Sequence, residues 1–202
     1  MGVRTHVVAE RRELVELLGG LTDEQWQTPS LCGGWTVRDV AVHLSLDAVP
    51  LPRYTLGLLR RPNPIAYNDH YVASHRDVTT DELVAVLAGS AETSWITRYW
   101  PRLGLADHLV HQQDIRRPLG LPRTIDPERL RLVLERPDPF ALPWRYTRGL
   151  RLVATDMDWR RGSGPEVRGP GEALALASVG RVAALDDLDG EGVETLRRRV
   201  AG

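Results

Sequence analysis

Three side chains in this sequence could together bind a divalent metal ion: His43, Asp107 and His111. Asp107 and His111 are four residues apart in the stretch DHLVHQQD, a spacing that places both on one face of an α-helix. Asp114, seven residues after Asp107, falls on the same face, whereas His108 points elsewhere. Two imidazoles and one carboxylate would leave the fourth position of a tetrahedral site open to water or substrate.

His43 lies in the stretch LCGGWTVRDVAVHL, which predicts a tight loop followed by a helix. Thr36 is a good N-cap, and Asp39 three residues later favours the positive end of the helix. Trp35, just before the cap, can pack back on the helix. Because His43 shares its face with apolar residues, we expect its imidazole to point into the protein.

A structural role for the same polar residues remains open at this stage. Aspartate and histidine recur at this spacing by chance in many helices, and His43 could hydrogen-bond to Asp107 or Asp114 without any metal. Cys32, between the loop leucine and two glycines, is interpreted as a structural loop residue. His70 and His75 are interpreted as exposed histidines on a short helix.

Composition narrows the class of protein. A net charge of −1 argues against a polyanion such as nucleic acid as the main partner. One cysteine excludes an internal disulfide and a multi-cysteine zinc motif. Because there is neither an apolar run long enough to span a membrane nor a secretory signal, we expect a cytoplasmic protein without a membrane partner. All 26 basic residues are arginine, which indicates a GC-rich genome and suggests an actinobacterium.

The hydrophobic pattern predicts a helical bundle followed by a small mixed module. Apolar residues recur at helical spacing in four segments, which cover residues 3–19, 37–48, 81–100 and 104–117. Two strands, within 149–159 and 165–169, flank the turn-rich RRGSG, and two further helices follow them. The predicted class is α+β, mainly α, with one domain over residues 1–140 and a small α+β module over 141–202.

Three stretches resemble a known family. CGGWTVRDVAVHL is close to the signature C-x-G-W-T-V-R-D-x-x-x-H-L of the mycothiol-dependent maleylpyruvate isomerase family, part of the DinB-like superfamily of metal-binding four-helix bundles. DHLVHQQDIRRPLG looks like the second signature of that family. GLRLVATDMDW with EVRGPGEALALASVGR is similar to the sterol-carrier-like α+β module at the carboxyl end of many members.

The resemblance implies a divalent metal, usually zinc, held by His43, Asp107 and His111, with Asp114 orienting a histidine from outside the ligand set. It indicates no further catalytic side chain. Asp107 departs from the family pattern, because members usually have glutamate there and the shorter arm reaches less far. The shorter side chain of Asp107 can change the affinity for the metal, which metal binds, and whether the site is occupied.

The resemblance also implies an enzyme that uses the thiol mycothiol, found in actinobacteria, for isomerisation or S-transfer on a small electrophilic substrate. Two other classes stay open: a metal-assisted hydrolase with the same ligands, and a non-catalytic small-molecule-binding or stress-response protein. Metal content and thiol affinity distinguish the three. We expect a small-molecule substrate and the thiol as binding partners, and a monomer or homodimer.

Overall fold

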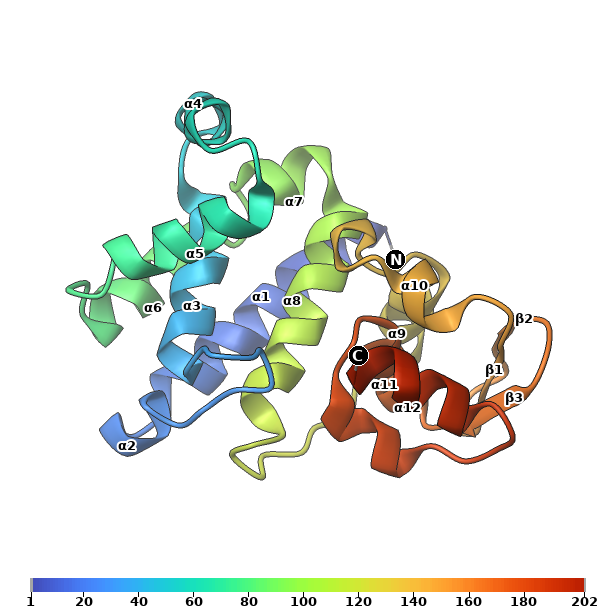
Figure 1. Ribbon diagram of the computed structural model, residues 1–202. Helices are drawn as coiled ribbons and strands as arrows, with labels where there is room; N and C mark the ends of the chain where they lie inside the picture. The colour runs from blue at the N-terminus through green and yellow to red at the C-terminus, as the bar shows by residue number, and fades with distance from the viewer. Residues whose placement is uncertain (1, 202) are drawn as a thin grey trace. The chain divides into compact units, whose positions relative to one another are not determined.

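The computed structural model of the protein describes residues 2–201 and is mainly helical (Figure 1). The chain divides into two compact units, Met1–Pro122 and Arg123–Gly202. The first unit is built from helices, and the second carries a three-stranded sheet together with helices. This confirms the predicted class, mainly α with a small α+β part. Within residues 2–201, no helix combines the length and the apolar character needed to cross a bilayer.

Four helices of the first unit form the bundle. Helix α1 packs against α6 and α8, and α3 packs against the same two helices. Leucine and valine side chains from these helices make the core, among them Leu14, Val40, Leu44 and Leu87. The elements of this unit are α1 (Val3–Gly19), α2 (Asp23–Trp26), α3 (Val37–Ser45), the 3-10 turn η1 (Leu46–Ala48), α4 (Leu51–Arg60), α5 (Pro64–Ser74), α6 (Thr80–Ser90), α7 (Trp95–Tyr99) and α8 (Pro101–Arg116).

The loop before α3 forms as the sequence indicates. The Thr36 side chain accepts a hydrogen bond from the Asp39 N–H, and the Asp39 carboxylate accepts one from the Thr36 N–H, which makes a complete capping box. Gly34 adopts a φ of 80°, a conformation that favours glycine. The Leu31 N–H donates to the Asp114 carbonyl at 3.1 Å, so the loop is tied to α8 as well as to α3.

One prediction about the middle of the chain was wrong, and one helix there was not predicted. The single helix predicted over 81–100 is interrupted at residues 91–94, because the Ser94 side chain caps a new helix, α7, by accepting from the Thr97 N–H. Residues 51–60, which have a weak pattern, form α4. Pro52 lies in its first turn, where the missing N–H of proline costs nothing.

The second unit places three strands among its helices. Strand β1 is central, antiparallel to β2 and parallel to β3. Only two strands were predicted, because β2 falls inside the RRGSG stretch interpreted as a turn. The elements are α9 (Pro127–Glu135), η2 (Pro139–Ala141), α10 (Pro143–Thr147), β1 (Arg151–Ala154), β2 (Arg160–Gly162), β3 (Glu166–Gly169), α11 (Gly171–Ser178), η3 (Val182–Asp187) and α12 (Val193–Ala201).

The division between the units falls earlier in the chain than residue 140. Helix α9 was assigned to the bundle domain, whereas in the structure it packs against α11. Its buried residues include Leu130 and Leu134, and α11 is buried along its whole length. Because this apolar contact joins α9 to α11, the helix belongs to the second compact unit.

Candidate metal centre

The three side chains singled out in the sequence converge between α3 and α8. Nε2 of His43 lies 3.6 Å from Oδ1 of Asp107, and Nε2 of His111 lies 3.4 Å from the same oxygen. One potential ligand atom from each residue lies within 4.8 Å of the other two. The three side chains retain 11–18% of their exposure, so the group is mostly buried but open on one side.

Neighbouring aromatic rings hold the two imidazoles in place. The ring centroids of His43 and His111 are 4.8 Å apart in an edge-to-face arrangement. Trp35 also lies beside His43, with ring centroids 5.2 Å apart and the rings tilted. Trp35 therefore contacts a site residue in addition to closing the loop before α3.

Asp114 fixes the orientation of His111. Its carboxylate is fully buried, and Oδ2 lies 2.9 Å from Nδ1 of His111. Because a carboxylate only accepts, Nδ1 of His111 carries the proton and donates, which leaves the lone pair of Nε2 directed toward Asp107 and His43. This is the arrangement in which a neutral histidine can bind a metal.

Electrostatics keep Asp107 ionised. Burial raises the pKa of its carboxyl group, but the nearby imidazoles of His43 and His111 outweigh burial and bring the pKa well below its ordinary value. The carboxylate is thus in the charged form that a divalent cation requires.

A second group of potential ligands overlaps the first. Cys32, His111 and Asp114 each offer one atom within 4.8 Å of the others. Cys32 was interpreted as a loop residue, and the structure places its thiol near His111. The loop tie between Leu31 and Asp114 explains this proximity, since it brings residue 32 against α8.

A buried polar network beside the site was not predicted. Arg11 of α1 is 1% exposed and donates to Oδ2 of Asp47 at 2.8 Å and to Oγ of Ser90 at 2.8 Å. Nη1 of Arg11 also lies 2.8 Å from Nε2 of His108, the residue next to Asp107. The network joins α1, η1, α6 and α8. A sequence signal exists, because Arg11 occupies the apolar stripe of α1 four residues after Val7.

Burial sets the protonation of this network. Burial and the nearby Arg11 guanidinium together lower the pKa of His108 to about 3, so the imidazole is neutral. His108 then donates from Nδ1 to the Gly104 carbonyl at 3.0 Å and accepts from Arg11 at Nε2. Burial also raises the pKa of Asp47 to about 7, against the opposing effect of Arg11.

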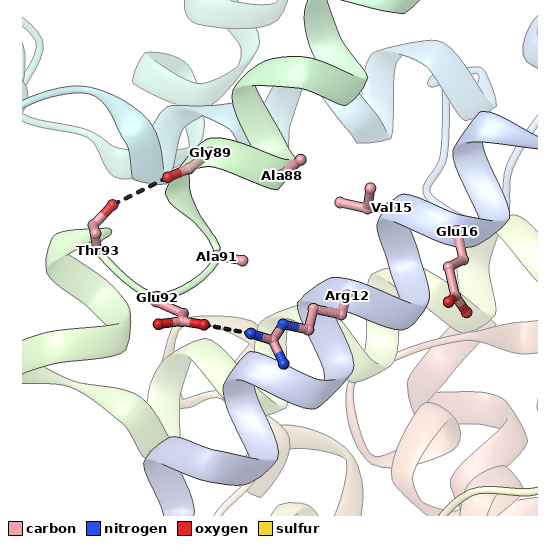
Figure 2. A pocket seen from close by; sticks show the side chains of 8 residues that line it. All are labelled: Arg12, Val15, Glu16, Ala88, Gly89, Ala91, Glu92 and Thr93. Carbon is pink, nitrogen blue, oxygen red and sulfur yellow. Dashed lines mark hydrogen bonds and ion pairs between the residues drawn. The ribbon is translucent and has the colours of Figure 1, made fainter.

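A separate cavity of about 520 Å³ lies between α1 and the end of α6 (Figure 2). Arg12 and Glu92 form an exposed ion pair there, and both side chains are drawn in Figure 2. None of the converging ligands lines this cavity. Its paired surface charges bring no reactive group together, so it is not the candidate site.

The first unit is a helical bundle inside which two histidines and one carboxylate converge, an arrangement that could hold a metal ion. Residues 7–93 match the family model described as "Mycothiol maleylpyruvate isomerase N-terminal domain". The match supports the predicted family, and residues 7–93 of the chain carry this domain. The match includes His43, while Asp107 and His111 follow it in α8.

Two solved structures share the fold. One is titled a crystal structure of the mycothiol-dependent maleylpyruvate isomerase, with 14% identity, a TM-score of 0.59 and coverage of 94% of this chain and 91% of that chain. A single-residue mutant of that enzyme matches with the same identity and coverage and a TM-score of 0.57. These relatives are enzymes, as the sequence predicts for this chain. No curated protein sequence gives a significant match.

The buried network predicts that two adjacent arginines, Arg11 and Arg12, contribute very different amounts to the stability of the protein. Arg11→Leu leaves its buried hydrogen-bond partners, among them Asp47 and Ser90, without a donor, so we expect the free energy of unfolding at pH 7 to fall by about 3–5 kcal/mol. Arg12→Leu removes only an exposed ion pair with Glu92 and should cost at most about 1 kcal/mol. Urea unfolding of both variants measures the difference. Equal costs would contradict the assignment of Arg11 as a buried organising residue.

Proposed function

We propose that this protein is a metal-dependent enzyme that uses mycothiol as a nucleophile to isomerise a small electrophilic substrate in the cytoplasm. One observation carries the proposal: His43, Asp107 and His111 converge in a chain whose amino-terminal part matches the mycothiol maleylpyruvate isomerase family. The family match favours a thiol-dependent reaction over the metal-assisted hydrolase and over a non-catalytic binding protein.

The donor set fits zinc. Nitrogen and oxygen ligands about 2.0–2.1 Å from a tetrahedral zinc ion lie roughly 3.3 Å from one another. The Nε2–Oδ1 distances of 3.6 Å and 3.4 Å are close to that value. When bound there, zinc would supply a coordination position that lowers the pKa of a thiol far below its free value of about 8.5, so that thiolate forms at neutral pH.

The side chains of the chain itself support this chemistry. His43 and His111 would contribute neutral donors and Asp107 a single negative charge, so with a divalent zinc ion bound the site would keep a net charge of about +1 for an anionic sulfur. Asp114 keeps the Nδ1 proton of His111 in place. Trp35 covers one face of His43 and limits the access of water from that side.

The thiol then acts without being consumed. Thiolate addition to a conjugated carbon–carbon double bond forms a carbon–sulfur bond and converts the double bond into a single bond that can rotate. Expulsion of the thiolate restores the double bond with the opposite geometry and returns the thiol. In S-transfer the same thiolate would displace a leaving group instead.

An activity assay tests the proposed function. Purified protein with zinc should isomerise maleylpyruvate only when mycothiol is added, and His43→Ala should reduce turnover to background. Cys32→Ser is the matched control, because we interpret Cys32 as a structural residue rather than as the nucleophile. Thiol-independent turnover would contradict the proposal. Loss of all activity in a folded, zinc-binding Cys32→Ser variant would point to a nucleophile supplied by the protein.

The carboxylate ligand can be tested by zinc titration calorimetry. Asp107→Ala should weaken zinc binding by more than about 100-fold, since a charged ligand is lost, whereas Asp107→Glu should hold or raise affinity by restoring the longer reach usual in the family. Asp69→Ala, an exposed aspartate on α5, is the control and should bind like wild type. Equal zinc affinity in wild type and Asp107→Ala would remove Asp107 from the ligand set and leave Asp114 as the candidate carboxylate.

A further inference from the structure

A groove of about 430 Å³ lies between α4 and α5, outside the metal centre. Helix α4 lies at the top of Figure 1, and α5 lies below it. Among the described residues that line the groove there are three arginines and two histidines and no aspartate or glutamate. The basic residues are Arg53, Arg60, Arg61, His70 and His75.

A close helix contact builds this groove. A Cβ atom at Gly57 would lie 2.4 Å from the Tyr67 hydroxyl, so the glycine lets α4 approach the Tyr67 ring. Arg53 and Arg60 lie four residues before and three residues after Gly57, which places all three on one face of α4. On α5, His70 follows Tyr67 by three residues and lines the groove from the other side. Basic side chains therefore reach the groove from both helices.

The three arginines in the groove have no internal counterions. Within residues 2–201, the guanidinium groups of Arg53, Arg60 and Arg61 make no hydrogen bond or ion pair. Arg11 and Arg12 on α1, by contrast, both have carboxylate partners. Gathering cations in one hollow without a counterion costs free energy, and a bound anion would offset that cost.

We propose that this groove binds a small phosphorylated molecule, namely a phosphate monoester attached to an organic body. Arginine forks match phosphate oxygens with paired, charge-assisted hydrogen bonds. The groove is larger than a phosphate group alone. Tyr67 and Tyr71, with the half-exposed Leu56, give it an apolar wall for the rest of the ligand. The metal centre plays no part in this binding.

The shape of the site favours a small molecule over a lipid surface. Leu59 and Ile65 are 76% and 68% exposed, and such apolar side chains beside arginines also occur in helices that lie on anionic membranes. The arginines here line a groove of about 430 Å³ between two helices, a volume in the range of small-molecule sites. The test must therefore distinguish binding of a phosphate monoester from binding to lipid vesicles.

Calorimetric titration with glucose 6-phosphate at low ionic strength tests the proposal on the full-length protein. Wild type should bind, and Arg53→Gln and Arg60→Gln should each weaken binding about tenfold or more, since each removes a charge-assisted hydrogen bond. Arg102→Gln is the matched control, because Arg102 is an exposed arginine outside the groove, and it should bind like wild type. Glucose, which lacks the phosphate, should not bind.

Several results would overturn the proposal. No binding of glucose 6-phosphate to folded wild type would do so, as would equal affinity in all four proteins, which indicates nonspecific charge attraction. Equal binding of citrate would remove the preference for phosphate. Binding that disappears after dialysis against a chelator would place the ligand at the metal centre. Binding to phosphatidylglycerol vesicles without binding to glucose 6-phosphate would assign the surface to membranes.

Discussion

Asp107 lies between the imidazoles of His43 and His111, and this contact joins α3 to α8 inside the bundle. A carboxylate removed from water is stable only when nearby groups favour its charge. The two histidines provide that favourable environment, since they bring the pKa of Asp107 below its ordinary value in spite of burial. The capping box of α3 and the tie between Leu31 and Asp114 set the relative position of the two helices.

The same requirement organises the polar residues deeper in the bundle. Arg11 pairs with Asp47 and Ser90, and His108 accepts from Arg11 while donating to a backbone carbonyl. Each ionisable group in this network thus has a partner, and the network passes directly beside Asp107. Stability and metal binding are therefore expected to be coupled in this protein, because the helices that hold the ligands are also held together by these buried pairs.

Much of the fold and of the candidate site could be predicted from local patterns in the sequence. Asp107 and His111 share a helix face because of their spacing, and Thr36 with Asp39 marks the start of α3. Features that depend on distant contacts were not predictable in this way. The Arg11 network needs four elements that are far apart in the sequence, and the contact of α9 with α11 moves the division between units. Short elements were missed too, because three residues of β2 carry no periodicity.

The central claim is that His43, Asp107 and His111 hold one metal ion to which a thiol binds. Cobalt(II) substitution tests this most directly, because the visible and near-ultraviolet absorption of cobalt reports both its geometry and a bound thiolate. We expect wild type to bind one cobalt ion with a tetrahedral spectrum and to gain a sulfur-to-cobalt charge-transfer band when mycothiol is added, and we expect neither in His43→Ala. A wild-type protein that binds no cobalt, or whose cobalt spectrum is unchanged by mycothiol, would contradict the account.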